Sequence, residues 1–421
     1  MKVQTAPSSS ACHRRSDCRL CGSKRVELVL ALAPTPPANA FVTAAERTKP
    51  QQAFPLDIFF CQDCCHVQLL DIVDPELLFS QYVYVSGTSP VFVKHFEEYA
   101  ASVIKTYALK QGELVVDIGS NDGTLLSFFQ KAGMKVLGID PAIQIAADAT
   151  ARGIETWNGF FDAASAKKIL AEKGKAKVVT ANNVFAHIDD LGSVVENIKT
   201  ILAADGVFVF EVSYLVDVFE KTLFDTIYHE HLSYHSVLAL KPFFEKHGME
   251  MIDAERVSSH GGSLRGTAQL KGGPHKTSPR VAETIAAEKK LGLDQADTLK
   301  AFSAKIDRIG GELRKLLLKL KTEGKTIAAY GAPAKATTLM HHFQIGSDVI
   351  DFVIDDSPLK IGLYTPGMHI PVVGSKEMYE RKPDAVVVLA WNFADSIIQK
   401  HSAFTHQGGQ FIVPLPEVKT M

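Results

Sequence analysis

The sequence predicts an α/β protein made of an N-terminal zinc-binding domain and two Rossmann-like α/β units. Three observations predict this fold class. The chain has 421 residues, which is the length of two or three domains of about 150 residues each. All six cysteines lie in the first 65 residues, and a strand, a glycine turn and a helix follow one another twice farther along the chain. We expect domains at residues 1–85, 86–270 and 281–421.

The composition is that of a soluble globular protein, with 46% hydrophobic and 22% charged residues. The 45 basic and 47 acidic residues give a formal net charge of −2, so there is no overall positive field for nucleic acid or an anionic membrane. No apolar run approaches the length of about 20 residues that crosses a bilayer, and the N-terminus has no apolar segment typical of a signal peptide. We expect a cytoplasmic protein without nucleic-acid or membrane partners.

The first domain carries two CxxC pairs, Cys18 with Cys21 and Cys61 with Cys64, separated by 39 residues. Disulfides are disfavoured because the cytosol is reducing. Four thiolates complete a tetrahedral structural zinc site and leave no open position for chemistry. The alternatives are reduced core cysteines, a CxxC redox pair, or a zinc site in which His66 replaces one thiolate.

The second region begins near residue 113 with the strand ELVVDIG, the turn SNDG and a helix. Asp117 lies at the end of the strand, and Gly119, Asn121 and Gly123 form the turn, where glycines allow the backbone to approach a ligand. Asp140 ends the next strand, where a carboxylate can accept hydrogen bonds from both ribose hydroxyls. This arrangement predicts a cofactor that contains adenosine.

The form of the turn favours one cofactor over another. DxGxNxG lacks the third glycine of the GxGxxG dinucleotide pattern and resembles motif I of class I methyltransferases. An acidic Asp117 is also better tolerated beside a sulfonium than beside a pyrophosphate. We predict S-adenosylmethionine, with a nicotinamide dinucleotide or an empty packing turn as alternatives. Asn182 and Asn183 lie where such enzymes contact adenine and the methionine moiety, although Asn183 is equally compatible with a simple turn.

A third segment, DTIYHEHLSYHS, concentrates three histidines, one glutamate and two tyrosines in eight positions. The unperturbed pKa of histidine, about 6.5, suits proton transfer at neutral pH. We interpret the segment as a general acid–base cluster. The alternatives are a metal site that uses the i, i+4 spacing of His231 and His235, and a polar packing stretch.

Two further segments carry candidate substrate contacts. SHGGSLR offers His260 and Arg265, and Arg265 could bind an anion or cap a helix. YVYVSGTS offers the hydroxyls of Tyr82 and Tyr84, although this alternation is also typical of an ordinary strand.

The last third begins with a polar, Gly- and Pro-rich stretch at 269–280, which we interpret as a linker. A helical segment follows to about residue 321, and then the second strand, turn and helix, KTIAAYGA and PAKATTLMHHF. The amides of a helix N-terminus with Gly331 and Lys335 suit a diphosphate. The alternative is a close-packed turn without a ligand.

Taken together, the motifs resemble those of the sugar C-methyltransferases that act on nucleotide-linked keto-deoxyhexoses. The resemblance rests on the two CxxC pairs, DIGSNDG, YHEHLSYHS, HGGSLRG, YGAPAKATTLM and IDDSPLKIGLYTPGMHIPV in this order. It implies an N-terminal zinc domain, a central class I methyltransferase domain that binds S-adenosylmethionine, and a C-terminal Rossmann-like domain that helps to bind the nucleotide sugar. It also implies a monomer.

The resemblance implies that His231 is the general base, with Tyr228 and Glu230 as partners and Tyr84, in preference to Tyr82, facing the same cavity. His231 would remove the proton next to a ketone, and the resulting enolate carbon, expected to be C3 of a 4-keto-6-deoxy sugar, would attack the sulfonium methyl. Glu230 would orient His231 or stabilise its charged form. The alternatives are a nicotinamide-dependent sugar-nucleotide oxidoreductase or epimerase, an inactive zinc adaptor, and a methyltransferase on oxygen or nitrogen.

Overall fold

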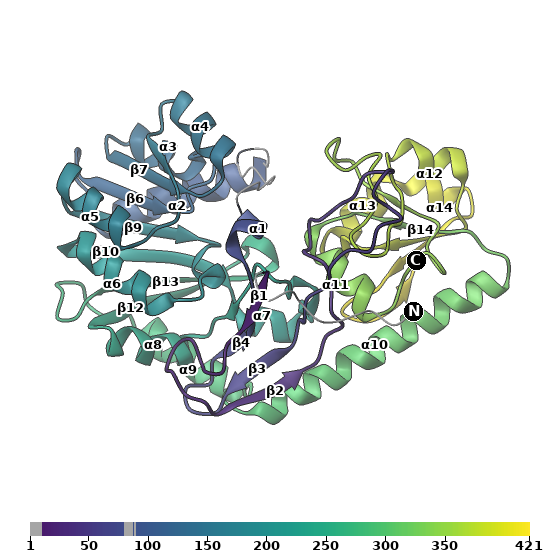
Figure 1. The fold of residues 1–421 in the computed structure, drawn as a ribbon, viewed down its shortest axis with the longest axis horizontal. Helices are drawn as coiled ribbons and strands as arrows, with labels where there is room; N and C mark the ends of the chain where they lie inside the picture. The colour runs from purple at the N-terminus through teal and green to yellow at the C-terminus, as the bar shows by residue number, and fades with distance from the viewer. Residues whose placement is uncertain (1–10, 80–86, 88–89) are drawn as a thin grey trace.

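The computed structural model of the chain describes residues 11–79, 87 and 90–421. Figure 1 shows two lobes that are joined along one side by a long helix and by the N-terminal domain. Tyr82 and Tyr84 lie outside the described residues, so their place near the site stays a prediction.

The N-terminal domain is built on a small antiparallel sheet. In spatial order its strands are β11 (Ser233–Tyr234), β4 (Val67–Leu69), β3 (Ile58–Cys61) and β2 (Val26–Leu30). A second pair, β1 (Cys12–Arg14) and β5 (Asp71–Val73), precedes the helix α1 (Pro75–Phe79). Since β11 comes from the YHEHLSYHS segment, the N-terminal domain shares a sheet with the part of the chain that carries the acid–base cluster.

The central unit is built on a seven-stranded sheet. In spatial order its strands are β12 (Met249–Val257), β13 (Ser263–Leu270), β10 (Leu202–Ser213), β9 (Ala176–Asn182), β6 (Leu114–Ile118), β7 (Lys135–Asp140) and β8 (Thr156–Asn158). The last five run parallel, and β12 and β13 form an antiparallel hairpin at one edge. The strand β6 is buried throughout because helices cover both faces of the sheet.

These helices belong to two separate cores. Val115 of β6 joins the core that contains residues of the first two helices, and Val116 joins the opposite core. The helices are α2 (Pro90–Thr106), α3 (Thr124–Lys131), α4 (Ile143–Ala151), α5 (Ala163–Glu172), α6 (Leu191–Ile201), α7 (Leu215–Glu220) and α8 (Val237–Lys246), and the 3-10 helices are η2 (Phe185–His187), η3 (Phe224–Thr226) and η4 (Ser259–Gly261).

The C-terminal unit repeats the α/β plan on a six-stranded sheet. In spatial order its strands are β16 (Val372–Val373), β15 (Phe352–Ile354), β14 (Ile327–Tyr330), β17 (Ala385–Val388), β18 (Gln410–Val413) and β19 (Lys419–Thr420). All but β19 run parallel. Its helices are α11 (Ala334–His342), α12 (Lys376–Arg381), α13 (Ala394–Lys400), α14 (Ser402–His406) and the 3-10 helix η5 (Trp391–Phe393).

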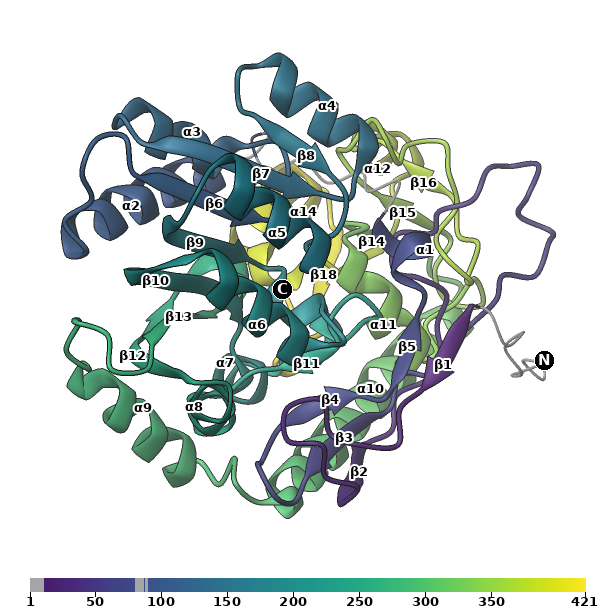
Figure 2. The same ribbon diagram turned by 60° about the vertical axis from the view of Figure 1, so that its left-hand side comes forward.

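The predicted linker and the helical segment after it differ from the structure. Residues 269 and 270 still belong to β13, and the helix α9 (Pro279–Lys290) begins with Pro279 after the N-cap Ser278. The predicted helical segment consists of two helices, because a turn with Gly292 at a φ of 73° separates α9 from α10 (Ala296–Thr322). With 27 residues, α10 is about 40 Å long and runs beside β2 from one lobe to the other (Figures 1 and 2).

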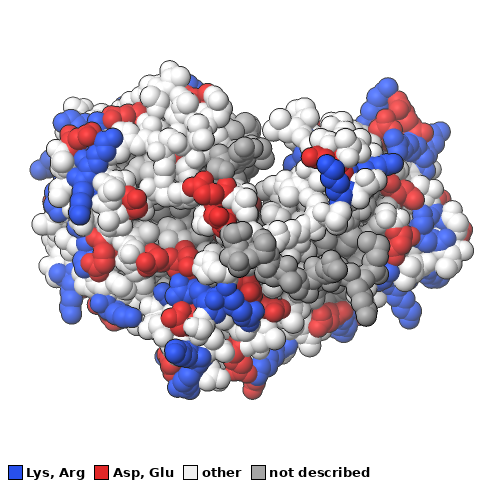
Figure 3. Space-filling model, viewed as in Figure 1, with Lys and Arg blue, Asp and Glu red and all other residues white. Residues whose placement is uncertain are grey.

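The surface carries both signs of charge in alternation. On the face in Figure 3, Lys and Arg are interspersed with Asp and Glu, and a notch separates the two lobes. Within the described ranges, no helix has the length and apolar character that a membrane span requires.

Candidate active site

The carboxyl ends of the parallel strands meet at one edge of the central sheet. The chain runs from β6 to β7 and β8 on one side and then returns to β9 on the other side of β6. The crevice between β6 and β9 is therefore the topological switch point, where α/β proteins bind ligands. The predicted turn at 119–123 and Asn182 both lie at this edge.

Two carboxylates lie beside the first glycine turn, at the ends of β6 and β7. Asp117 is buried, accepts a hydrogen bond from the Thr180 hydroxyl over 2.6 Å, and has a pKa raised to about 7 by burial. Asp140 accepts the amides of Asn121 and Ala142, each over 2.8 Å, one on each carboxylate oxygen. Each oxygen keeps a second lone pair, so Asp140 can still accept the two hydroxyls of a ribose.

The glycines of this turn serve the protein itself. Gly119 and Gly123 have φ angles of 67° and 74°, in the left-handed region that favours glycine. A Cβ at Gly119 would meet Val184 at 2.3 Å, and one at Gly123 would meet Ile154 at 2.8 Å. The two glycines therefore face protein side chains, where the sequence argument expected a ligand.

At this edge of the sheet, the side chain of Asn182 is left without partners among the described residues. Its Oδ1 and Nδ2 are both buried and have no hydrogen-bond partner within the described part of the chain. An unpaired buried amide is costly, and a bound adenosine or methionine group would satisfy it. Asn183 has a φ of 55° and donates its amide to the Glu211 carbonyl over 2.8 Å, so it holds the turn.

His231 is oriented by the backbone. Its Nδ1 lies 2.7 Å from the carbonyl oxygen of Thr226, which can only accept, so Nδ1 carries the proton and Nε2 keeps its lone pair. Burial lowers the pKa of His231 to about 4. The neutral ring, the form that can take a proton, therefore prevails at neutral pH. The resemblance implies that Glu230 orients His231 or stabilises its charged form, and at Nδ1 the Thr226 carbonyl makes the orienting bond.

The rings around His231 include a histidine that the sequence argument missed. The ring centroid of Tyr228 lies 4.2 Å from that of His231. The ring centroid of His187, which comes from η2, lies 5.0 Å from that of His231. His187 in turn stacks on Phe79 with centroids 5.5 Å apart. His187 closes η2, directly after β9. The sequence signal that could have identified His187 is its position five residues after Asn182, at the switch point.

The remaining histidines of the segment point elsewhere. His229 is buried against the Phe54 carbonyl, and His235 is buried between the rings of His66 and Phe185. The metal reading of His231 and His235 is wrong, because the segment forms a turn and a short strand in which the helical i, i+4 spacing has no meaning. Among the described residues, the four cysteines form the one group suited to a metal ion.

Glu230 faces the N-terminal domain. It is 6% exposed, and its Oε1 accepts a hydrogen bond from Asn39 over 3.3 Å. Asn39 belongs to the extended segment between the two CxxC pairs. Glu230 thus links this segment to the loop of His231.

Arg265 is already paired. Its Nε donates to Glu211 over 2.7 Å, and its guanidinium lies 4.4 Å above the Tyr99 ring. The same carboxylate receives His95 Nε2 at 2.8 Å. Arg265 therefore holds the hairpin to the sheet. His260 belongs to η4, and its side chain lies outside the described part of the chain.

The helix that opens after the second glycine turn contacts the segment just before His231. Gly331 has a φ of 90°, and a Cβ there would meet Ala390 at 2.7 Å. The ammonium of Lys335 lies 3.5 Å from the buried carboxylate of Asp225 and 4.4 Å from the Trp391 ring centroid. Asp225 directly precedes Thr226, so Lys335 reaches the loop that orients His231, and its charge is matched there.

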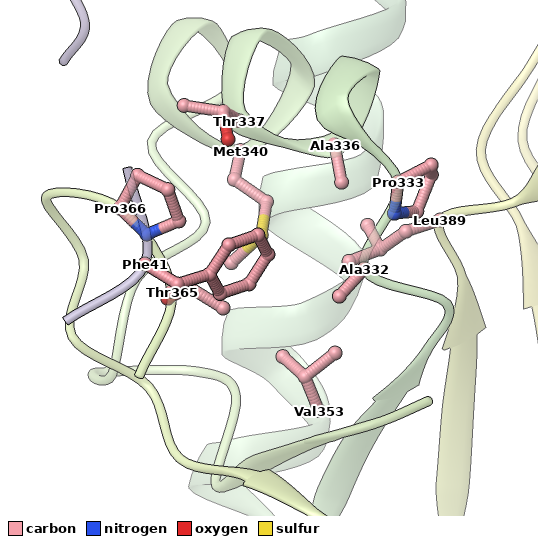
Figure 4. Close-up of a pocket in the computed structure, with 10 residues that line it drawn as sticks. All are labelled: Phe41, Ala332, Pro333, Ala336, Thr337, Met340, Val353, Thr365, Pro366 and Leu389. Carbon is pink, nitrogen blue, oxygen red and sulfur yellow. The ribbon is translucent and has the colours of Figure 1, made fainter. Parts of the chain in front are cut away.

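The helix α11 joins the three parts of the molecule. The Thr338 hydroxyl donates to the Ile227 carbonyl over 2.6 Å, and the Thr337 hydroxyl donates to the Ala38 carbonyl over 2.9 Å. Next to it, the ring of Phe41 inserts beside the helix in a small apolar pocket (Figure 4). The pocket is lined by Phe41, Ala332, Pro333, Ala336, Thr337, Met340, Val353, Thr365, Pro366 and Leu389.

The four predicted zinc ligands converge. The Sγ atoms of Cys18 and Cys64 lie 3.5 Å apart, as do those of Cys21 and Cys61, and all four lie within 4.8 Å of one another. Zinc–sulfur bonds of about 2.3 Å in a tetrahedron place the sulfurs about 3.8 Å apart. The cluster thus fits a tetrahedral zinc ion, with one CxxC turn on each side.

Three family models match the chain in succession. "Putative zinc binding domain" matches residues 18–79, "Methyltransferase domain" matches 92–254, and "C-methyltransferase C-terminal domain" matches 258–416. C-methyltransferase NovU of Streptomyces niveus is 35% identical over 405 residues, which are 96% of each chain. The chain belongs to this C-methyltransferase family. The membership confirms the predicted resemblance, the zinc-binding domain and the S-adenosylmethionine-dependent methyltransferase domain.

Solved structures also resemble the methyltransferase part. An S-adenosylmethionine-dependent methyltransferase of Clostridium acetobutylicum has a TM-score of 0.35 and 13% identity, and covers 43% of this chain and 92% of its own. Magnesium protoporphyrin IX methyltransferase of Synechocystis, solved with S-adenosylhomocysteine, has a TM-score of 0.33 and 16% identity, and covers 43% of this chain and 85% of its own. The family membership favours the predicted C-methyltransferase over the two alternatives, an oxidoreductase and an inactive adaptor.

Proposed function

We propose that this C-methyltransferase methylates C3 of a nucleotide-linked 4-keto-6-deoxy sugar. The arrangement of His231 is the observation that carries the proposal. Its Nδ1 is held by the Thr226 carbonyl, its Nε2 can accept a proton, and Tyr228 and His187 flank the ring. A carbon acceptor needs such a base, because carbon next to a ketone becomes nucleophilic only after it loses its proton.

The first glycine turn supports binding of S-adenosylmethionine through three side chains. When bound, this cofactor supplies an electrophilic methyl group on a sulfonium. Asp140 accepts the ribose hydroxyls, Asn182 fills its unmet hydrogen bonds, and the Asp117 carboxylate attracts the positive charge. Gly119, Asn121 and Gly123 give the turn its left-handed backbone, and Asn183 has the same conformation in the turn after β9.

In the proposed reaction Nε2 of His231 takes the proton from C3 of the sugar. The electron pair of the C–H bond moves into an enolate, and the C4 oxygen takes the negative charge, stabilised by a donor such as the Tyr228 hydroxyl. The enolate carbon forms the new C–C bond while the bond between the methyl group and sulfur breaks. The carbonyl of Thr226 and the carboxylate of Glu230 stabilise the charged imidazolium.

The substrate is placed between the loop at 226–231 and the amino end of α11. Gly331 and Lys335 lie at this junction and are proposed to meet the diphosphate, which then competes with Asp225 for the ammonium of Lys335. The proposed sugar contacts are Tyr82, Tyr84 and His260, and Arg265, which would contact the sugar while its guanidinium stays paired with Glu211. Cys18, Cys21, Cys61 and Cys64 are proposed to hold a structural zinc ion.

Proton exchange and methyl transfer test the proposal separately. In deuterated water with S-adenosylhomocysteine, the wild type is expected to exchange the C3 proton of the nucleotide keto sugar, followed by NMR. With S-adenosylmethionine it is expected to form a C-methyl product, followed by mass spectrometry. His231→Gln is expected to slow both about 10²- to 10⁴-fold, because a general base contributes that much.

Two controls define the result. The affinity for S-adenosylhomocysteine is expected to stay unchanged in His231→Gln, and His406→Gln, at an exposed histidine of the C-terminal unit, is expected to behave as wild type. Exchange and transfer at wild-type rates in His231→Gln would remove His231 as the base. Methylation of a different acceptor class by the wild type would refute the sugar assignment alone.

A further inference from the structure

Arg19 lies inside the first CxxC turn and reaches out of the N-terminal domain. Its side chain is fully buried, with 0% exposed. Cys18 and Cys21 flank it on the turn, which the amide of Gly22 closes by donating to the Cys18 carbonyl over 2.8 Å. The backbone of Arg19 is therefore set by the same turn that presents two sulfurs to the zinc ion.

The guanidinium contacts two segments of the central unit. Nη1 donates to the Leu232 carbonyl over 2.6 Å, and Nη2 lies 3.4 Å from Oδ1 of Asp189. Nη2 also donates to the Leu69 carbonyl over 2.9 Å, which ties the guanidinium to β4. Nη1 also donates to Oε1 of Gln68 over 3.2 Å, so four acceptors on three segments surround one planar group. The fork geometry of arginine fits this arrangement, and a lysine ammonium does not.

Both segments carry a histidine of the candidate active site. Leu232 follows His231, and Asp189 lies two residues after His187. The amide of Leu232 donates to the Ala186 carbonyl over 2.9 Å, so the two segments are already joined beside the two rings, whose centroids are 5.0 Å apart. Arg19 adds a second tie to the same pair of segments, from the side of the zinc turn.

The contacts of Arg19 are not those of a surface arginine. The guanidinium is fully buried and still charged, because arginine does not lose its proton in proteins. Arg25, which also lies next to the CxxC turn, is 66% exposed and pairs with Asp63 of the same domain. Of these two arginines, Arg25 therefore stabilises the surface of the N-terminal domain, and Arg19 contacts the two segments that carry His187 and His231.

We propose that Arg19 is a positioning residue for methyl transfer, which couples the zinc-bound turn to the relative placement of His187 and His231. The proposal rests on the proposed function, in which His231 is the base. The zinc ion would fix the conformation of the Cys18–Cys21 turn, and this turn would fix the position of the Arg19 guanidinium. The guanidinium in turn bonds to Leu232 and Asp189 and so keeps the two histidine segments together. Loss of either the zinc ion or the guanidinium displaces the rings while the cofactor turn at 117–123 stays in place.

Arg19→Met, with Arg25→Met as the matched control, tests the coupling in the full-length, zinc-loaded protein. Arg19→Met is expected to keep one zinc ion and the wild-type affinity for S-adenosylhomocysteine, with kcat lowered about tenfold to hundredfold, as misplaced catalytic groups cause. KM for the sugar substrate is expected to change much less than kcat. Arg19→Lys is expected to recover only part of kcat, and Arg25→Met is expected to match the wild type.

A readout without substrate separates this proposal from the reaction itself. The ring nitrogens of His187 and His231, followed by NMR, are expected to shift in Arg19→Met and after removal of zinc by a chelator, and to stay unchanged in Arg25→Met. These shifts would support the coupling even if the acceptor were another molecule. Unchanged ring signals together with an unchanged kcat would overturn it.

If Arg19→Met does not fold, Asp189→Asn decides. This change weakens the contact of Asp189 with the Arg19 guanidinium, together with its 2.9 Å ion pair with Arg15, and leaves the CxxC turn intact. The same displacement of the His187 ring signal and a smaller fall in kcat are expected. Wild-type signals and kcat in folded Asp189→Asn would refute the coupling.

Discussion

In both Rossmann-like units the first strand ends at a glycine in the left-handed conformation. The φ angle is 67° at Gly119 and 90° at Gly331. The amide of Gly119 donates to the Ile139 carbonyl, and that of Gly331 donates to the Ile354 carbonyl, each over 2.7 Å. The next strand carries an aspartate directly after that isoleucine in both units. The two turns are thus built from the same hydrogen bonds.

The aspartates also make equivalent bonds. Asp140 accepts the amide of Asn121 over 2.8 Å, and Asp355 accepts the amide of Ala332 over 2.6 Å. Each aspartate also accepts a hydrogen bond from the backbone amide two residues later, Ala142 for Asp140 and Ser357 for Asp355. This part of the comparison gives no reason to assign a ligand to one unit and not to the other.

The units differ in the polar groups that the protein leaves unsatisfied. In the first unit the buried Asp117 has a raised pKa, and both polar atoms of Asn182 lack partners among the described residues. In the second unit the Tyr330 hydroxyl donates to Asp356 over 2.8 Å, and Lys335 is paired with Asp225. The first turn thus leaves polar groups for the proposed cofactor, whereas the second turn pairs its lysine with another part of the protein, and the proposed diphosphate has to compete for it.

The largest effect is expected from the domain contact of the second unit. Lys335→Met leaves the buried Asp225 without its cation, and breaking a buried ion pair costs about 3–5 kcal/mol. Urea unfolding followed by tryptophan fluorescence measures the loss. Asp225→Asn combined with Lys335→Met is expected to recover part of the stability, because no unpaired charge remains. A loss in Lys335→Met well below that range would mean that water or another group already solvates Asp225.

A pair of matched substitutions tests the ligand side of the comparison. Asp140→Asn is expected to weaken S-adenosylhomocysteine binding about tenfold to hundredfold, since hydrogen bonds to a charged group are worth about 1.5–3 kcal/mol. Asp355→Asn makes the same change in the second unit and is expected to leave the affinity unchanged. Calorimetric titration measures both. Equal losses in the two variants would show that the second unit also contributes to the cofactor site.

The pH dependence of cofactor binding sharpens the role of Asp117. Its pKa of about 7 means that it is largely neutral at pH 6 and ionised at pH 8. The cationic S-adenosylmethionine favours the carboxylate, and the neutral S-adenosylhomocysteine does not. The ratio of their affinities is therefore expected to rise with pH over this range by up to about tenfold, which corresponds to one pKa unit. Asp117→Asn is expected to remove the rise, and a rise that persists in this variant would assign it to another group.

The same raised pKa has a consequence for the free protein. In the folded state Asp117 binds its proton more tightly than in the unfolded chain, where its pKa is about 3.9. Its contribution to stability is therefore complete below about pH 4 and is lost as the pH rises to about 7. Asp117→Asn is expected to lessen this loss in urea unfolding at pH 8.

The sequence was sufficient for those parts of the site that depend on local order. The CxxC pairs, the DIGSNDG turn and its aspartate are short patterns whose geometry follows from the strand and turn that contain them. The fold class follows from the alternation of strands and helices for the same reason. Even so, the local pattern could not tell which glycine turn keeps unsatisfied groups.

The remaining parts depend on contacts between distant segments. The pairing of Arg265 with Glu211 spans 54 residues, and that of Lys335 with Asp225 spans 110. His187 and His231 meet because the Leu232 amide donates to the Ala186 carbonyl and joins the loop at 226–231 to η2. The i, i+4 reading of His231 and His235 failed because pairing of β11 with β4, 167 residues away, overrides any helical tendency of the segment.

The smallest expected effect is a change in protein stability that has opposite signs in the two units. Asn182→Ala removes two buried polar atoms that have no described partner, so it is expected to leave the free protein as stable as before or up to about 1 kcal/mol more stable, while weakening S-adenosylhomocysteine binding. Tyr330→Phe removes a hydroxyl that the protein already satisfies, so it is expected to cost about 1 kcal/mol and leave the affinity unchanged. Thermal unfolding and titration of both variants measure the contrast. A loss of stability in Asn182→Ala as large as that in Tyr330→Phe would show that the protein itself satisfies Asn182, and the difference between the two turns would then lie in Asp117 alone.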